Sequence, residues 1–501
     1  MSPWTRGLLL SMVTSSVVLT QAPVPHLNRF LEAADVDDRV GRAALGELGR
    51  GWNDSYAALI VDLARFMRPP RVTPSDTGGP SDNLEDRVDP ERRPQRKAAG
   101  AAGTDDPNVN RGSPVRRRLV TFLERQTGRR FGDDLDGWRR WYWALPYEPH
   151  PDYAEFKGWL YARIDPRMRA FFPANARATI RLDEIDWGGV TVNGIPPLRD
   201  PKVLPVRDAG YLKDSHIVFG VVVNGEARAY PKRILGWHEM AIDKVGGVEL
   251  TIVYCTLCGT VIPYESVAGG RHYKLGTSGL LYQSNKLMFD EDSNSLWSTF
   301  EGVPVVGSLV GSGVKLRSRP AVTTTWKEWR TLHPETTVLS LDTGHRRDYA
   351  EGAAYRSYFG TDQLMFEVSK KDGRLKNKAE VLVMQLPALD KPGGVVPVAI
   401  EVRLLRAREV YAFSAAGAQY VVLTTAAGAN RVYRTSVTFP DQKSRPTILD
   451  ASRRSWHVTE DALVLATGAA TDVTARAPRV SAQRAFWFGW FAQFPQTVLL
   501  K

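Results

Sequence analysis

Cysteine is scarce in this chain, which has only 2 cysteines, Cys255 and Cys258, among its 501 residues. So few thiols exclude a disulfide-rich scaffold and a structural zinc site with four cysteine ligands. Both thiols lie in a single Cys-x-x-Cys motif, so any metal, disulfide or thiol redox chemistry is concentrated there. Histidine is also scarce, with 8 residues in all, and this limits the nitrogen ligands that a metal site can recruit.

Long apolar runs are missing as well. A membrane helix needs about 20 consecutive apolar residues, and no segment after the N-terminus approaches that length. Near the N-terminus, Arg6 precedes an apolar run over residues 7–19, followed by small or polar residues up to Ala22. This order is typical of a secretory signal peptide, so the sequence predicts a signal over residues 1–22, no stable membrane span, and an exported protein, periplasmic or extracellular. A buried first helix is the alternative interpretation.

The chain also lacks the motifs of several common function classes. It has no Gly-x-x-x-x-Gly-Lys motif and no dinucleotide fingerprint after a strand, so no nucleotide cofactor is expected. Ser278 lacks the Gly-x-Ser-x-Gly elbow of hydrolases. The net charge of +11 is not accompanied by a recognisable nucleic-acid module, and we interpret it as solvated surface. The expected partner is an unknown small molecule or protein, and not nucleic acid.

Two helical parts are expected before residue 181. Apolar residues recur at spacings of three and four over residues 23–68, where residues 35–48 have the cadence of a HEAT-type repeat. Residues 69–113 are rich in Pro, Gly, Asp and Arg, which predicts a disordered linker. Helical spacing returns over residues 114–180, where Trp138, Trp141 and Trp143 cluster. Such tryptophans pack in a core more often than they line a groove.

Residues 181–501 have the pattern of a large β-rich domain. Short runs rich in β-branched residues alternate with turn dipeptides, and Asn224-Gly225 between two alternating strands predicts a hairpin. Further strands are expected at residues 248–254, 303–309, 366–369, 380–385, 398–404, 420–424 and 432–437. The predicted fold class is therefore α+β, with N-terminal helical segments followed by a large, mainly β domain that is a barrel or sandwich with decorations.

The Cys-x-x-Cys motif differs from the active site of thioredoxin-like proteins. In those proteins the first cysteine begins a helix whose dipole lowers the thiol pKa, whereas Cys258 is followed by Gly259, β-branched residues and Pro263. A strand, then Cys-x-x-Cys-Gly, then a second strand is the pattern of a metal knuckle, in which the glycine adopts a positive φ. Two cysteines supply only two ligands, so a disulfide or redox pair and two inert buried thiols stay open as alternatives.

Further metal ligands would come from residues near the motif. His238 and His272 are the nearest histidines in the sequence, and antiparallel pairing of strands would bring them to the cysteines. Two thiolates with one or two imidazoles suit copper or zinc. Glu239 and Asp243 are the nearest carboxylates, and we assign them as candidate catalytic groups that handle protons.

A longer pattern surrounds the motif. It consists of the segments PLRDPKVLP, RAYPKRILGWHEMAIDKVGG, YCTLCGTVIPYE, GTSGLLYQSNKLMFDEDSNSLWSTFEG and TTTWKEWRTLHPETTVLS, and of FWFGWFAQFPQT at residues 486–497. In this order the segments resemble the bacterial and archaeal family catalogued as domain of unknown function 3179. The resemblance covers residues 188–358 and the closing segment, and it implies no particular reaction. The matching positions are Arg228, Tyr230, Pro231, His238, Glu239, Asp243, Tyr254, Cys255, Leu257, Cys258, Gly259, Ser278, Gly279, Leu280, Asp290, Ser295, Leu296 and Trp297.

The chain departs from the family pattern at two positions. Thr256 stands between the cysteines where the family usually has proline. Phe494 stands before Pro495 where the closing segment often has histidine. If that histidine contributes to a metal site elsewhere in the family, this chain has lost the ligand.

The sequence therefore predicts an exported protein with a metal or redox centre built on Cys255 and Cys258. His238 is the first additional ligand, and Glu239 or Asp243 handles protons beside it. The competing hypothesis is a non-catalytic extracytoplasmic binding or scaffold protein, in which the cysteines form a structural disulfide and the helical N-terminal part docks a partner. In an oxidising compartment an unmetallated pair would tend to close.

Overall fold

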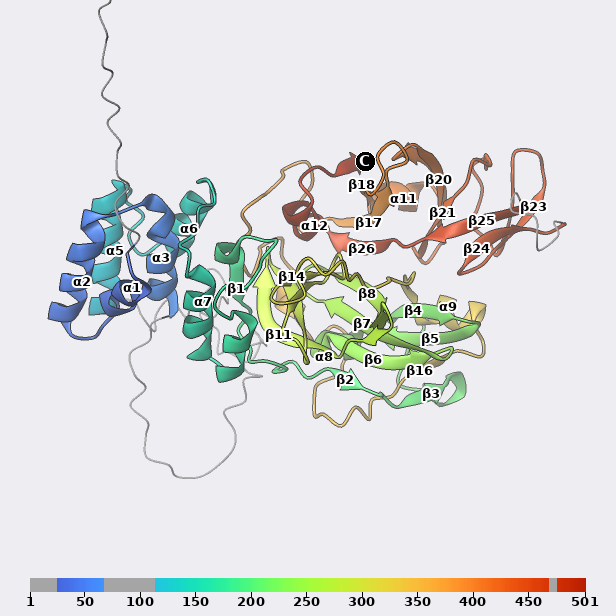
Figure 1. The fold of residues 1–501 in the computed structure, drawn as a ribbon. Helices are drawn as coiled ribbons and strands as arrows, with labels where there is room; N and C mark the ends of the chain where they lie inside the picture. The colour runs from blue at the N-terminus through green and yellow to red at the C-terminus, as the bar shows by residue number, and fades with distance from the viewer. Residues whose placement is uncertain (1–24, 67–112, 468–474) are drawn as a thin grey trace, which may run out of the picture.

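The structure is a computed structural model that describes residues 25–66, 113–467 and 475–501 (Figure 1). The predicted signal over residues 1–22 lies outside these ranges, and so does the predicted linker over residues 69–113 apart from Ser113. Within the described ranges, no helix has the length and apolar character needed to cross a membrane.

Helices make up the N-terminal part of the described chain. They are α1 (Leu27–Ala33), α2 (Asp38–Arg50), α3 (Ala57–Phe66), α5 (Pro114–Thr127), α6 (Leu135–Trp143) and α7 (Tyr153–Ala162). The Asp37 side chain accepts a hydrogen bond from the backbone N–H of Arg39 and so caps the start of α2. Helix α5 begins with Pro114 and ends at Thr127, and the next residue, Gly128, has a φ of 68° that stops the helix.

These helices share one hydrophobic core that continues into the first β-sheet. Its buried members include Phe30 of α1, Leu59 of α3, Trp138 of α6 and Phe156 of α7. The same core contains Phe289 of strand β12 (Asn285–Asp290). The segments predicted as a HEAT-like module and as a Trp-rich helical region therefore pack together, and Trp138 is a core residue.

A buried group of charges ties the helices to the β domain. Asp186, on strand β1 (Ile185–Trp187), lies 2.9 Å from Arg65 of α3 and 2.9 Å from Arg139 of α6. Nearby, Lys157 of α7 lies 3.0 Å from Asp62 of α3. Burial alone would raise the pKa of Asp186, but Arg139 and Arg65 outweigh it and lower the pKa to about 2. Because β1 pairs with strand β11 (Leu275–Tyr282), these charges join the helical part to the first sheet.

The chain after residue 184 folds into several curled sheets (Figure 1). One five-stranded sheet has the order β1-β11-β12-β13-β14, with β13 at Leu296–Ser298 and β14 at Pro304–Val306. A second has the order β15 (Val322–Thr325), β4 (Ile217–Val223), β5 (Glu226–Pro231), β16 (Thr337–Leu339), β3 (Val203–Pro205). A four-stranded sheet has the order β2 (Leu198–Arg199), β6 (Met240–Val245), β7 (Val248–Cys255), β8 (Thr260–Glu265). The short strands β9 (Val267–Ala268) and β10 (Arg271–His272) pair with each other.

The C-terminal part adds two further sheets. One has the order β26 (Gln483–Phe486), β17 (Glu380–Pro387), β18 (Val395–Glu401), β27 (Val498–Leu500). The other has the order β19 (Val410–Ala415), β20 (Ala418–Thr424), β21 (Asn430–Arg434), β25 (Arg476–Val480), β24 (Ala462–Leu465), β23 (Ser455–Val458), β22 (Thr447–Leu449). Short helices α8 (Lys232–His238), α9 (Trp326–Leu332), α10 (Arg356–Phe359), α11 (Val402–Ala407) and α12 (Trp487–Gln493) connect the strands. The predicted α+β class, with helices before a large β-rich region, is confirmed.

Several strand predictions differ from the structure in extent. The strand predicted over residues 303–309 covers only Pro304–Val306, and the one predicted over residues 432–437 ends at Arg434. Residues 366–369 form no strand, because the Ser369 backbone N–H donates to the Gln283 side chain at 2.8 Å instead of to a neighbouring strand. The strand predicted over residues 398–404 ends at Glu401, where α11 begins. In that helix Val402 and Leu405 are the buried residues, and their spacing of three suits a helical turn.

Candidate functional site

The two cysteines lie at a hairpin turn. Strand β7 ends at Cys255, which pairs with Thr260 at the start of β8. A disulfide joins Cys255 to Cys258, and their Cα atoms are 5.5 Å apart. Gly259 has φ 65°, a left-handed conformation that favours glycine and lets the chain turn into β8. The predictions of a positive-φ glycine and of a strand after the motif are thus confirmed.

Segments far away in the sequence enclose the disulfide. Cys255 is 1% exposed and Cys258 is 0% exposed. The Phe486 backbone N–H donates a 2.7 Å hydrogen bond to the Cys258 carbonyl. The Tyr358 hydroxyl donates a 2.8 Å hydrogen bond to the Leu257 carbonyl. Both bonds attach these enclosing segments, which we call the cover, to the backbone of the cysteine loop. The loop is therefore fixed as well as buried.

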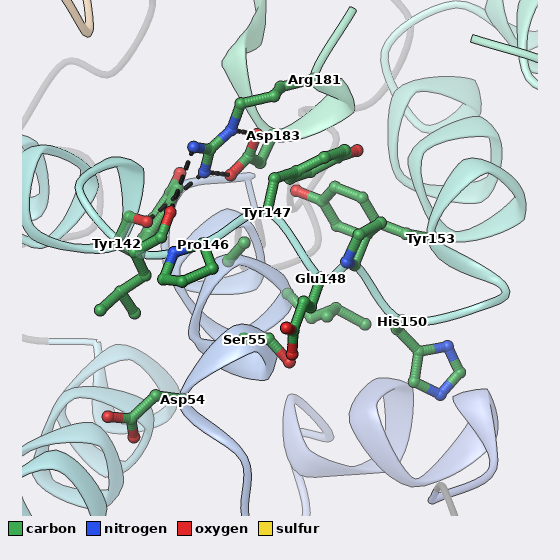
Figure 2. A pocket seen from close by; sticks show the side chains of 14 residues that line it. Asp54, Ser55, Tyr142, Pro146, Tyr147, Glu148, His150, Tyr153, Arg181 and Asp183 are labelled. Carbon is green, nitrogen blue, oxygen red and sulfur yellow. Dashed lines mark hydrogen bonds and ion pairs between the residues drawn. The ribbon is translucent and has the colours of Figure 1, made fainter.

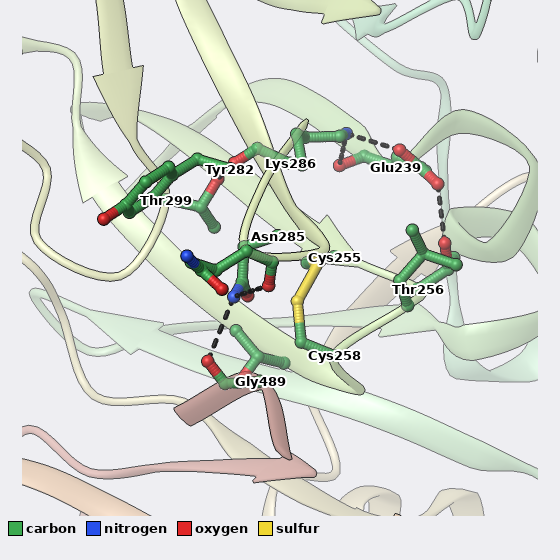
Figure 3. Close-up of a disulfide and its surroundings, with 12 residues drawn as sticks. Glu239, Cys255, Thr256, Cys258, Tyr282, Asn285, Lys286, Thr299 and Gly489 are labelled. Atoms are coloured by element: carbon green, nitrogen blue, oxygen red, sulfur yellow. Dashed lines mark hydrogen bonds and ion pairs between the residues drawn. A yellow bond between two sulfur atoms is a disulfide. The ribbon is translucent and has the colours of Figure 1, made fainter. Parts of the chain in front are cut away.

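Helix α12 packs directly against the disulfide. A Cβ built on Gly489 would lie only 2.9 Å from the Cβ of Cys258. Asn285 anchors the helix, because its Nδ2 donates a 3.0 Å hydrogen bond to the Gly489 carbonyl (Figure 3). A larger residue at position 489 would push the helix away, so the closing segment needs glycine at this contact.

A buried ion pair lies beside the cysteine loop. Glu239 ends helix α8 with φ 54°. Its Oε1 accepts hydrogen bonds from the Thr256 hydroxyl at 2.6 Å and from the Tyr355 hydroxyl at 3.2 Å. Its Oε2 lies 2.8 Å from Lys286 Nζ, which also donates a 3.1 Å hydrogen bond to the Glu239 carbonyl (Figure 3). Glu239 and Lys286 are 6% and 5% exposed, so both charges are shielded from water.

Burial changes the acid–base properties of this group. It lowers the pKa of Lys286, and the negative charge of Glu239 and its hydrogen bond oppose the shift. It raises the pKa of Tyr355, and the charge of Glu239 raises it further. The Lys286 ammonium therefore gives up a proton more readily than an exposed lysine, while the tyrosine stays neutral.

Asp243 belongs to a different cluster from Glu239. Its Oδ2 accepts hydrogen bonds from Arg228 at 2.7 Å and from the Tyr230 hydroxyl at 2.8 Å. Burial raises the pKa of Asp243, and the charge of Arg228 opposes that shift. On β6, Asp243 lies opposite Leu250, five positions before Cys255 along β7. The structure therefore places one of the two candidate carboxylates at the cysteine loop and the other further along the sheet.

His238 is fully buried, and both of its ring nitrogens have partners. Nδ1 lies 2.9 Å from the Pro196 carbonyl and Nε2 lies 2.5 Å from the Tyr349 hydroxyl. Because a carbonyl only accepts, Nδ1 carries the proton and Nε2 accepts from Tyr349. Burial lowers the pKa of His238 to about 4, although the bond to Pro196 opposes the shift. The neutral ring is thus engaged with Pro196 and Tyr349.

His272 lies at the surface on β10. Its side chain is 41% exposed, and its Nε2 pairs with Glu249. Among the residues that the structure describes, no group of three or more His, Cys, Asp and Glu side chains is arranged to hold a metal ion. The disulfide occupies both thiols, so copper or zinc at this pair stays a prediction for the reduced form.

The sequence matches a family described as "Protein of unknown function (DUF3179)" over residues 192–497. The chain belongs to this family. The disulfide, the Glu239–Lys286 pair and helix α12 all lie within the DUF3179 domain. Comparisons with curated proteins and with solved structures give no match.

The two departures from the family pattern both affect this site. Thr256 supplies the hydroxyl that reaches Glu239, and proline at this position would have no such donor. Phe494 packs on Trp490 with ring centroids 4.4 Å apart, in the same core cluster as both cysteines. The link from the cysteine loop to Glu239 through a hydroxyl is therefore a feature of this chain within the DUF3179 pattern.

Sequence reasoning missed Lys286 and Tyr355. Lys286 stands in the run NKLMF, every residue of which is buried in strand β12. A lysine inside an apolar strand is a usable signal, because a buried ammonium requires a partner. Tyr355 has no comparable local signal, because it reaches Glu239 from a distant loop with φ 56°.

A small hollow also lies among polar groups in the helical part. It lies between η1 (Asp54–Tyr56) and the segment after α6, and its cavity volume is about 20 Å³. Figure 2 shows Arg181 beside Asp183 at its edge, and the two side chains are 2.7 Å apart. The Tyr142 hydroxyl is buried there, and none of the residues that the structure describes is a hydrogen-bond partner for it. The volume suits a water molecule and not a substrate, so the cysteine loop is the stronger candidate.

Proposed function

We propose that the DUF3179 domain of this protein carries a thiol–disulfide redox centre at Cys255 and Cys258. The observation that carries the proposal is the 2.6 Å hydrogen bond from Thr256, inside the cysteine loop, to the buried Glu239–Lys286 pair. Ionisable groups with shifted pKa values cluster at functional sites, because chemistry needs them there. In this pair burial lowers the pKa of Lys286, which makes its ammonium the candidate proton donor beside the cysteine loop.

A purely structural role explains this arrangement less well. The disulfide joins residues with a sequence separation of 3, and closing so short a loop contributes only about 2 kcal/mol to stability. A buried ion pair is also a weak source of stability, because both charges lose their water. Two buried charges beside a weak crosslink favour a disulfide that reacts.

The proposed reaction is exchange with a partner dithiol. A thiolate of the partner attacks one sulfur, the S–S bond breaks, and its electron pair leaves on the other sulfur, which takes a proton. The second thiol of the partner then displaces the sulfur that was attacked, and this sulfur also takes a proton. The partner becomes a disulfide, and two electrons and two protons have passed to Cys255 and Cys258. Lys286 donates the proton to the leaving thiolate and regains one from the proton that the partner's first thiol released, while Glu239 holds the Lys286 side chain in position.

Exchange requires the cover of the site to open. Both sulfurs lie beneath α12, and a partner thiol must reach one of them in line with the S–S bond. The Phe486 backbone N–H attaches the cover to the Cys258 carbonyl, and the Asn285 side chain on β12 holds the Gly489 carbonyl of α12. The proposal therefore includes a displacement of α12 before the partner reacts.

An exported location fits this chemistry. Disulfides form and persist in oxidising compartments and are rare in the cytosol. The Cys255–Cys258 disulfide therefore supports the expectation, based on residues 1–22, that the protein is periplasmic or extracellular. A reductant for the site must then be a thiol protein or thiol compound of the same compartment.

The burial of both cysteines favours a second candidate. In this alternative the protein is an extracytoplasmic binding or scaffold protein, and the disulfide is structural. The exposed fractions of 1% and 0% are what an inert crosslink would show. The two candidates differ in one observable property, because an inert crosslink reacts with reductant only when the domain unfolds.

A metal-bound form is a third state of the same pair. Reduction would release two thiolates, which are soft ligands that suit copper or zinc. His238 would have to break its bond to Tyr349 to join them. Elemental analysis of protein purified from its own compartment, with and without reductant, tests this state: about one equivalent of metal after reduction supports it, and metal content unchanged by Cys255→Ser rules it out.

A thiol count under native conditions tests the redox proposal. The full chain is treated with dithiothreitol, the thiols are trapped with a mass label, and the fold is followed by circular dichroism. The proposal predicts two labelled thiols in folded protein and recovery of the disulfide on reoxidation. Labelling that appears only together with unfolding would favour the structural crosslink. Cys255→Ser, which leaves one thiol, calibrates the count.

A further inference from the structure

A groove between α2 and α5 lies outside the DUF3179 domain. Its volume is about 740 Å³. A Cβ on Gly41 would meet the Arg118 guanidinium, and a Cβ on Gly49 would lie 2.7 Å from the Gln126 side chain. The start of α2 therefore faces the start of α5 and its end faces the end of α5, so the two helices run in the same direction along the groove.

Each helix contributes one row of side chains to the groove. The row on α2 is Arg42, Gly46, Arg50, and the row on α5 is Arg117, Thr121, Arg125. Residues four apart lie on the same face of a helix. Residues eight apart are separated by about 12 Å along the helix axis. Both rows thus have an arginine at each end and a small residue in the middle.

The arginines at these ends are exposed and have few partners. Arg42 pairs with Asp38. Within the described residues, Arg50, Arg117 and Arg125 form no ion pair. Arg118 is different, because it is buried and donates to Asp38 and to backbone carbonyls of the α1–α2 turn. Among the described residues, the groove therefore has a net positive charge that ion pairs only partly neutralise.

We propose that this groove docks an acidic segment of a partner protein in extended conformation. Guanidinium groups bind carboxylates through paired hydrogen bonds, which makes arginine the preferred residue for such contacts. An extended peptide rises about 3.3 Å per residue, so carboxylates four residues apart match the spacing of the arginines. At the centre of the groove, no atom of the described residues lies within 4 Å of a Cβ on Gly46, which leaves room for a peptide backbone.

The lining favours a peptide over nucleic acid. Asp38 lies among the arginines, and a duplex carries one negative charge per about 1.7 Å, so its phosphates would meet this carboxylate. Single-stranded nucleic acid needs aromatic faces for its bases, and Phe122 of the groove is only 3% exposed. In a peptide whose carboxylates are four residues apart, neighbouring carboxylates are about 13 Å from each other. When one of them binds Arg42, the next lies well beyond Asp38, so the peptide places no negative charge there.

Peptide binding to the full chain tests the proposal. The probe is a fluorescein-labelled peptide of glutamates spaced four residues apart with serines between, and binding is followed by anisotropy. The control peptide has lysine for each glutamate. We expect saturable binding of the glutamate peptide that weakens with salt, and a loss of at least about tenfold in affinity, or 1.4 kcal/mol, in the triple variant Arg50→Ala, Arg117→Ala, Arg125→Ala.

Position 46 provides the matched pair of variants. Gly46→Ala adds only a methyl group and should weaken peptide binding far less than a charged side chain at the same position. Gly46→Glu adds a carboxylate at the centre of the groove and should abolish binding, while both variants keep the fold because helix propensity improves. A Gly46→Glu variant that binds normally would overturn the proposal.

Removal of exposed arginines from a different surface provides the second control. Arg207, Arg317 and Arg403 lie in the DUF3179 domain with side chains 83%, 68% and 87% exposed. Replacing all three by alanine should leave peptide affinity unchanged. An equal loss in this variant, equal binding of the lysine peptide, or tighter binding of duplex DNA or phosphatidylserine vesicles would each overturn the assignment of an acidic peptide.

Discussion

Gly489 lies against Cys258 so closely that a Cβ on the glycine would be 2.9 Å from the Cβ of the cysteine. Position 489 is helical and needs no positive φ, so only this contact requires glycine. The closing segment of the DUF3179 domain thus reaches the disulfide from a distance of more than 200 residues in the sequence. The disulfide and α12 consequently form one packing unit.

Gly489→Ala should move α12 away from the disulfide. The added methyl group overfills a packed contact, and we expect a loss of about 1–3 kcal/mol in the free energy of unfolding. We also expect native-state reduction by dithiothreitol to become at least about tenfold faster, because the cover is weakened. Reduction is measured by thiol trapping, and stability by urea unfolding.

Gly373→Ala is the control for this change, because a Cβ there would meet nothing within 4 Å and φ is not positive. It should change neither rate nor stability by much. If Gly489→Ala lowers stability but leaves the rate of native-state reduction unchanged, then α12 is not the barrier to exchange.

Lys286→Met should destabilise the domain by about 3–5 kcal/mol, because it leaves the buried carboxylate of Glu239 without its cation. The double variant with Glu239→Gln removes both charges, and we expect its loss to be smaller than the sum of the two single losses by about 1–3 kcal/mol. Urea unfolding at neutral pH of the four proteins measures this coupling. Additive losses would show that the two side chains do not act as a pair.

His238 should make stability fall as the pH falls from 6.5 to about 4. Its folded pKa is lowered to about 4 from the ordinary value of 6.5, so in this window the unfolded chain binds a proton that the folded chain does not. The expected loss is about 3 kcal/mol. His238→Gln should lack this part of the pH dependence, and urea unfolding at pH 7 and pH 4.5 measures the difference. Equal pH dependence in both proteins would contradict the assignment of a neutral buried ring.

Much of the fold could be predicted because its signals are local. The Asn224-Gly225 turn, the glycine after Cys258 and the helical spacing before residue 181 each reflect a preference of a few neighbouring residues. The covering of the cysteines by α12 could not be predicted, because that contact joins Cys258 to Gly489 and depends on packing across the whole domain.

The site was predictable only in part for the same reason. Glu239 is 16 positions before Cys255 in the sequence, and its place beside the loop follows from the antiparallel pairing of β6 and β7. Lys286 and Tyr355 reach it from other strands and loops, so no spacing rule finds them. His238 was a plausible ligand by sequence distance, but its ring is turned to Pro196 and Tyr349, which the sequence pattern does not specify.

If Glu239 and Lys286 control the redox chemistry of the disulfide, as we propose, removing either charge should shift its midpoint potential. The potential is measured in dithiothreitol buffers at neutral pH for the unmodified chain, Glu239→Gln, Lys286→Met and Asp243→Asn. Glu239→Gln leaves a cation that favours a thiolate and should raise the potential, whereas Lys286→Met leaves an anion and should lower it, each by about 30 mV or more. Asp243→Asn, which removes a buried carboxylate from a separate cluster, should leave it unchanged. Equal potentials in all four proteins would contradict the account and identify the disulfide as a structural crosslink.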